Sequence, residues 1–188
     1  PTGCGKSVFV FKMLDNLADM ITPTPQKVIY CYGEYQPGFD KYPWVEFHEG
    51  LPKSEMFDGT PTLVVIDDLM NETNDMVANI FIKISHLRSV SVIYITQNVF
   101  HKNKQSRTIS LNTHYMVLFK SPRDAGQIAV LGRQLYPEHS KLLVEAFEDA
   151  TSTPHSYLLL DLRPETGENY RVRANIVIGD QQIVYNPK

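Results

Sequence analysis

The sequence has few cysteines, no long apolar run and no strong excess of charge, and each of these absences excludes a class of protein. Cys4 and Cys31 are the two cysteines among 188 residues, and their spacing fits no metal site. We expect no structural disulfide, which suits an intracellular, reducing compartment. The sequence contains neither a signal peptide nor an apolar run long enough to span a bilayer, so we expect no membrane partner.

The net charge of −3 provides no overall attraction to nucleic acid. Contact with DNA would therefore depend on a local basic patch. Residues 101–107 (HKNKQSR) form the one dense basic segment, with Lys102, Lys104 and Arg107 as the candidate DNA contacts. The alternative is that this segment is an ordinary solvated loop.

The first seven residues resemble the end of a phosphate-binding loop of the form G-x-x-x-x-G-K-[ST]. Gly3 and Gly5 allow backbone N–H groups to turn toward an anion, and a helix that follows at once adds its N-terminal dipole. Lys6 would contact the β- and γ-phosphates of ATP, and the Ser7 hydroxyl would bind Mg²⁺. The candidate nucleotide-binding residues are Pro1, Thr2, Gly3, Cys4, Gly5, Lys6 and Ser7. The alternative is a glycine-rich turn that caps an ordinary helix.

The sequence begins inside this motif, without an initiator methionine. We therefore expect the leading glycine and a strand to precede Pro1, and residues 1–188 to be one P-loop ATPase domain that lacks that N-terminal strand. Because such a strand lies near the centre of the sheet, the isolated chain should be poorly active.

Polar residues follow two buried apolar runs. Residues 63–66 are followed by Asp67 and Asp68, and residues 91–95 are followed by Thr96 and Gln97. Acids at the carboxyl end of a parallel strand reach the ligand site, where Asp67 would hold Mg²⁺ and Asp68 would orient or deprotonate water. Gln97 would hydrogen-bond a phosphate or that water. The alternatives are an Asp turn or helix cap and a turn amide.

The remaining periodicity predicts an α/β fold. Helices are expected at residues 7–20, 74–87, 123–133 and 138–149, and further strands at residues 28–32, 44–47 and 115–119. The helix at 7–20 would bury a stripe through Val8, Phe11 and Leu14. Two late strands, at residues 157–162 and 170–178, should pair in antiparallel fashion around the Pro164 to Gly167 turn.

The ordered set of GCGKS, VIDD and a strand ending in ITQN resembles the FtsK/HerA group of RecA-like ATPases. Within it, the sequence is similar to the DNA-packaging ATPases of Polinton/Maverick elements, adintoviruses and virophages, which are relatives of the poxvirus enzyme. The segments that carry this resemblance are residues 28–36 (VIYCYGEYQ), 66–72 (IDDLMNE), 107–115 (RTISLNTHY) and 121–124 (SPRD).

The resemblance implies a RecA-like, mostly parallel sheet flanked by helices and a Mg²⁺-dependent ATPase that packages viral double-stranded DNA. Lys6 and Ser7 match the Walker A positions, Asp67 matches the metal-holding Walker B acid, and Gln97 matches the sensor glutamine. Asp68 stands where many relatives carry Glu, one methylene longer. Arg88 falls where such ATPases present an arginine finger to the next subunit; a helix-terminal cation is its alternative, and Arg107 is the rival finger.

The resemblance also implies a homo-oligomeric ring, pentamer or hexamer, at the capsid vertex. Its location would be the host nucleus or a cytoplasmic virus factory, with the virion as a further site. Two other functions stay open: a cellular or conjugative DNA pump of the same superfamily, and a non-hydrolysing module that binds nucleotide or a capsid protein.

Overall fold

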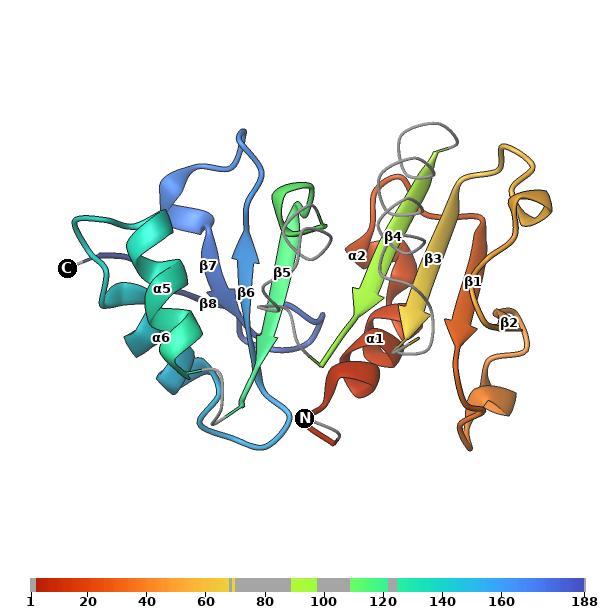
Figure 1. Cartoon of the computed structure of the whole chain (residues 1–188), viewed down its shortest axis with the longest axis horizontal. Helices are drawn as coiled ribbons and strands as arrows, with labels where there is room; N and C mark the ends of the chain where they lie inside the picture. Colours follow the sequence, from red (N-terminus) through yellow and green to blue (C-terminus); the bar gives the residue numbers. More distant parts are fainter. Residues whose placement is uncertain (1–2, 68, 70–88, 98–108, 122–124, 188) are drawn as a thin grey trace. The chain divides into compact units, whose positions relative to one another are not determined.

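A computed structural model describes residues 3–67, 69, 89–97, 109–121 and 125–187, which belong to two compact units (Figure 1). The central unit is Leu17–Asn112, and the terminal unit combines Pro1–Asn16 with Thr113–Lys188. The expected helix at residues 74–87 lies outside the described residues, as do Pro1, Thr2, Asp68, Arg88, Lys102, Lys104 and Arg107.

The central unit contains a four-stranded sheet in the order β2-β1-β3-β4, and every neighbouring pair is parallel. Its strands are β1 (Lys27–Tyr32), β2 (Glu46–Glu49), β3 (Thr62–Asp67) and β4 (Val90–Ile95), and it also includes α2 (Leu17–Met20), η1 (Phe39–Lys41) and η2 (Ser54–Met56). Figure 1 shows β1, β3 and β4 pointing the same way. The predicted α/β class and parallel strands are confirmed, with β2 two residues later than expected.

The inner strands β1 and β3 are covered on both faces. All six residues of β3 are buried, as are Val28 to Cys31 of β1. One face of the sheet packs in a hydrophobic cluster that includes Ile29, Cys31, Phe57, Val64, Ile66, Leu69 and Val90. This double burial explains why both strands read as continuous apolar runs in the sequence.

The expectation that β4 is buried on both faces is wrong. Ser91 is exposed, and Val92, Ile93 and Tyr94 are only half-buried. The reason is its position: among the described strands, β4 is the last of its sheet and pairs with β3 alone. A strand at the edge of a sheet lacks one flanking neighbour, so its side chains receive less cover.

The single helix expected at residues 7–20 is divided in two. α1 (Lys6–Asp15) ends at Asn16, whose side-chain Nδ2 donates to the Lys12 carbonyl at 2.9 Å and caps the last turn. The predicted stripe is also wrong in part, because Val8 is 50% exposed. The buried residues of α1 are Phe9, Val10, Met13 and Leu14. Asn16 separates two helices that belong to different units.

The terminal unit contains a second four-stranded sheet, in the order β5-β6-β7-β8, and all of its pairs are antiparallel. Its strands are β5 (Tyr115–Phe119), β6 (Tyr157–Asp161), β7 (Val172–Ala174) and β8 (Ile183–Val184), with α5 (Ala125–Leu135), α6 (Leu142–Ala150) and η3 (Glu168–Tyr170). The expected antiparallel pairing of the two late strands is confirmed, and this hairpin is not part of the parallel sheet. It belongs, with β5, to a separate antiparallel one.

A buried carboxylate fixes the connection between β6 and β7. Asp161 is fully buried and accepts hydrogen bonds from the guanidinium groups of Arg163 and Arg173, with Oδ2 3.0 Å from each. Burial acts to raise the pKa of Asp161, but the hydrogen bonds from the Arg163 side chain and backbone hold it below its ordinary value. Arg173 thereby ties β7 to Asp161 of β6, and Arg163 ties the connection between the two strands to the same carboxylate.

Two glycines of α5 make a matched pair for a stability measurement. A Cβ on Gly132 would lie 2.7 Å from the Ser140 carbonyl oxygen, whereas a Cβ on Gly126 would have no neighbour within 4 Å. We expect Gly132→Ala to lower the free energy of unfolding by roughly 1–3 kcal/mol, because backbone must move. Gly126→Ala should raise it by up to about 1 kcal/mol through helix propensity. Urea titrations would contradict this if both changes had the same sign.

Candidate phosphate loop and carboxylate site

The candidate phosphate loop has the backbone conformation that its glycines predict. Gly3 and Gly5 have φ of 79° and 106°, in the left-handed region where glycine is favoured. α1 begins directly after Gly5, whose carbonyl accepts the N–H of Phe9 at 2.9 Å. Gly5 is the N-cap and contributes no side-chain hydrogen bond. No N-cap side chain therefore competes with an anion that would bind the backbone N–H groups at the start of α1.

The loop is supported by a turn distant in sequence. A Cβ on Gly5 would lie 2.9 Å from the Cβ and 3.0 Å from the Cα of His155, so only glycine fits there. His155 itself has a φ of 64°. In α1, the ring of Phe9 packs edge-on against Tyr157 of β6, with the ring centroids 4.6 Å apart. The turn before β6 and β6 itself thus hold the first turns of α1 in place. The sequence does not predict this support, because neither His155 nor Tyr157 is part of a recognisable motif.

The two side chains that would contact a phosphate directly follow this loop. Lys6 and Ser7 are half-buried at the first two positions of α1, and Lys6 Nζ lies 3.7 Å from Cys4 Sγ. Both side chains lie in the first turn, where the positive end of the helix dipole favours an anion. This arrangement fits the triphosphate of a nucleotide.

The second group of candidate residues lies at the carboxyl edge of the parallel sheet. Asp67 is the last residue of β3, is 6% exposed, and its Oδ2 accepts a hydrogen bond from Tyr30 Oη at 2.6 Å. Asp67 pairs in register with Ile95, the last residue of β4, and Gln97 follows two residues later. Parallel strands end at one edge, so Asp67 and Gln97 share it, as the sequence predicts. A buried carboxylate at that edge suits Mg²⁺, which prefers oxygen ligands.

Lys6 and Ser7 belong to the terminal unit, whereas Asp67 and Gln97 belong to the central unit. That these four residues form one joint site therefore stays a prediction. The roles of the candidate residues outside the described part of the chain also stay predictions. Within that part, no three His, Cys, Asp or Glu side chains form a ready-made metal cluster.

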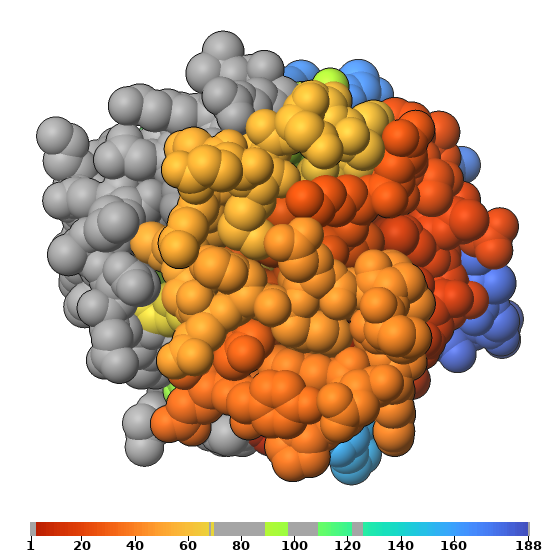
Figure 2. Space-filling model, turned by 90° about the vertical axis from the view of Figure 1, so that its right-hand side faces the viewer, coloured from red at the N-terminus to blue at the C-terminus, as the bar shows by residue number. Residues whose placement is uncertain are grey.

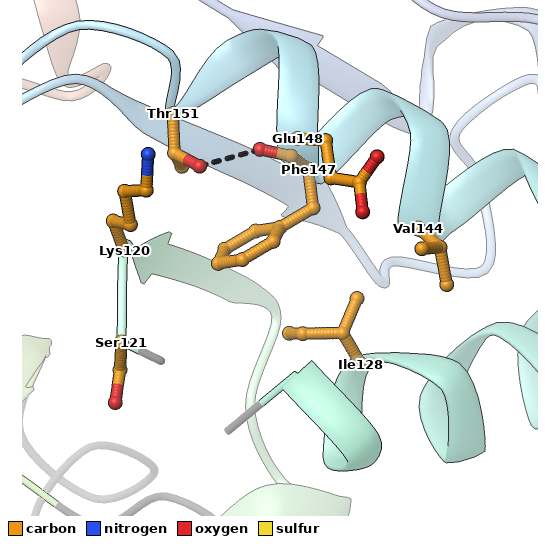
Figure 3. Close-up of a pocket in the computed structure, with 7 residues that line it drawn as sticks. All are labelled: Lys120, Ser121, Ile128, Val144, Phe147, Glu148 and Thr151. Carbon is orange, nitrogen blue, oxygen red and sulfur yellow. Dashed lines mark hydrogen bonds between the residues drawn. The ribbon is translucent and has the colours of Figure 1, made fainter. Parts of the chain in front are cut away.

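The terminal unit also has a small pocket, shown in Figure 3, which the candidate site does not use. Its volume is about 200 Å³, and it is lined by Lys120, Ser121, Ile128, Val144, Phe147, Glu148 and Thr151. The Phe147 ring lies between the end of β5 and Ile128 of α5. The Thr151 hydroxyl donates to the Phe147 carbonyl at 2.6 Å. The pocket is smaller than the roughly 300–1,000 Å³ of typical small-molecule sites, so it does not suit a nucleotide.

The connections on either side of β2 form an acidic surface, which includes much of the orange area in Figure 2. Residues 33–58 expose Lys41 and Lys53, together with six acids: Glu34, Asp40, Glu46, Glu49, Glu55 and Asp58. A local charge of this sign repels phosphate. These residues are therefore poor candidates for contact with a DNA backbone.

Comparison of the chain with protein-family models, with curated proteins and with solved structures finds no match. None of the helices in the described ranges combines the length and the apolar character that crossing a bilayer requires.

The two thiols should differ sharply in reactivity. Burial, followed by the charge of Glu46, raises the pKa of Cys31 to about 12, whereas Cys4 lies half-buried in the candidate loop. With a pKa of about 12, roughly one Cys31 thiol in ten thousand is a thiolate at pH 8, so a maleimide should label Cys4 first. Mass spectrometry of timed samples measures this, with Cys4→Ser as the control that loses the fast label. Equal labelling rates in the folded protein would contradict it.

Proposed function

We propose that this protein is a Mg²⁺-dependent ATPase that drives double-stranded DNA into a viral capsid. The observation that supports it best is the run from left-handed Gly3 and Gly5 directly into α1, with Lys6 and Ser7 in its first turn. An ordinary glycine-rich turn needs neither a lysine nor a serine there, whereas a nucleoside triphosphate uses both.

The parallel sheet of the central unit supports a RecA-like fold as part of this proposal. Its inner strand β3 ends in Asp67, and its neighbour β4 leads into Gln97. In the proposed reaction, Lys6 binds the phosphates, Ser7 and Asp67 hold Mg²⁺, and Gln97 orients the attacking water with Asp68. Bound Mg²⁺ would neutralise charge on the phosphates. Arg88 or Arg107 would act on the ATP of a neighbouring subunit in a homo-oligomeric ring.

Double-stranded DNA, the capsid vertex and a location in the host nucleus or virus factory enter the proposal from the sequence resemblance. The charge distribution reduces the number of surfaces that could contact DNA. The acidic surface at residues 33–58 leaves the basic segment at 101–107 as the best candidate for it.

Cys4 provides a direct probe of nucleotide binding, because it lies inside the candidate loop. In a protein that carries the complete motif before Pro1, Mg·ATP at ten times its dissociation constant should slow the labelling of Cys4 about tenfold. Lys6→Ala should abolish both this protection and ATP turnover, because the phosphates lose their fixed cation. Labelling rates with and without ATP are compared within each variant.

Lys12→Ala is the matched control, since Lys12 is an exposed lysine of the same helix. It should leave protection and turnover unchanged. Failure of ATP to protect Cys4 in the parent would overturn the proposed function. Protection without turnover would favour the non-hydrolysing module instead.

DNA binding is tested by removing two charges from the basic segment. Lys102→Ala with Lys104→Ala should weaken binding to unrelated duplexes alike and reduce the salt dependence by up to roughly two phosphate contacts. Lys41→Ala with Lys53→Ala is the control that removes two lysines from the acidic surface, and its salt slope should equal that of the parent. Fluorescence anisotropy at several salt concentrations measures both. A solvated-loop role for residues 101–107 predicts identical slopes in all three proteins.

A further inference from the structure

A tyrosine lies on the innermost part of the parallel sheet, at a position that packing alone would give to an aliphatic residue. Tyr30 is in the middle of β1, is fully buried, and is flanked along the strand by Ile29 and Cys31. Burying a phenol hydroxyl is costly unless it finds a hydrogen-bond partner. Its partner is Asp67, at 2.6 Å.

The position of the Tyr30 ring is fixed by two other aromatic side chains. Phe39 of η1 and Phe47 of β2 stack on each other at 4.2 Å, with planes 13° apart. The Tyr30 ring lies 5.4 Å from Phe39 and 5.6 Å from Phe47. Because three elements contribute to this cluster, the hydroxyl has little freedom to move away from Asp67.

We propose that Tyr30 is a positioning residue for the metal-holding carboxylate of Asp67. Its hydrogen bond engages Oδ2 and thereby fixes the rotation of the carboxylate group, so that the direction of Oδ1 is set before a metal arrives. Partners of this kind typically change the metal affinity of a carboxylate site by roughly 10- to 100-fold. The inference rests on the proposed function, in which Asp67 binds Mg²⁺.

A purely structural role makes a different prediction. If Tyr30 and Asp67 only satisfy each other as buried polar groups, removal of the hydroxyl lowers stability but leaves the metal affinity of the folded protein unchanged. Stability and metal affinity must therefore be measured separately.

The test is Tyr30→Phe, which removes one oxygen and keeps the ring that packs on Phe39 and Phe47. The readout is the Mg²⁺ concentration that gives half-maximal protection of Cys4 at a fixed ATP concentration, in the protein used above. We expect this concentration to rise by roughly tenfold or more. Tyr185→Phe is the matched control, because it removes a hydroxyl that donates to Asp149 Oδ2 at the same distance of 2.6 Å within the terminal unit. It should leave the concentration unchanged.

A second experiment repeats the Tyr30→Phe change in a protein that carries Asp67→Asn. If Tyr30 acts through Asp67, then adding Tyr30→Phe to Asp67→Asn should change the Mg²⁺ dependence no further, which is the signature of two coupled residues. An equal effect of Tyr30→Phe in both backgrounds would overturn the inference.

The outcomes separate the inference from the proposed function. If ATP fails to protect Cys4 in the parent, or if its protection does not depend on Mg²⁺, both are overturned. If the parent responds to Mg²⁺ and Tyr30→Phe responds identically, the inference alone is overturned.

Should Tyr30→Phe fail to fold, Phe39→Leu replaces it, because this change removes a ring that holds Tyr30 and leaves the hydroxyl in place. A rise of roughly threefold is then expected, and an unchanged value overturns the inference.

Discussion

Burial of β3 on both faces is the constraint on which the rest of the central unit depends. All six of its residues are buried, and the last of them is a carboxylate. A buried carboxylate must be hydrogen-bonded, and Tyr30 on the neighbouring strand supplies the donor. The Tyr30 ring in turn packs against Phe39, from the connection after β1, and Phe47 of β2. One hydrogen bond thus joins the acid at the end of β3 to a cluster of aromatic rings.

The candidate phosphate loop depends on a constraint of a different kind. Its conformation needs left-handed backbone at Gly3 and Gly5, which the glycines permit locally. Its support is not local, since the backbone of His155 lies against Gly5, and Tyr157 packs on Phe9. Residues more than a hundred positions away therefore decide how α1 enters its unit, and any substitution at Gly5 would displace them.

The two sheets differ in strand direction. β6 and β7 are joined by a short segment, and antiparallel pairing is the direct result of such a turn. β1, β2 and β3 follow one another through crossover connections at residues 33–45 and 50–61, and such connections let each strand start from the same end of the sheet. Apolar runs of similar length, LVVI in β3 and YLLL in β6, consequently belong to sheets of opposite type.

The sequence by itself determined the strands β1, β3, β5 and β6, the glycine-dependent turn before α1 and the polar residues at the ends of β3 and β4. These depend on local chemistry: apolar runs, left-handed glycines and acids that follow a strand. Only the tertiary structure decided that β4 is half-buried and that β5 is antiparallel to β6. The bond between Tyr30 and Asp67 belongs to the same group, since it joins residues 37 positions apart. Burial and pairing depend on which segments become neighbours in space, and no local pattern records this.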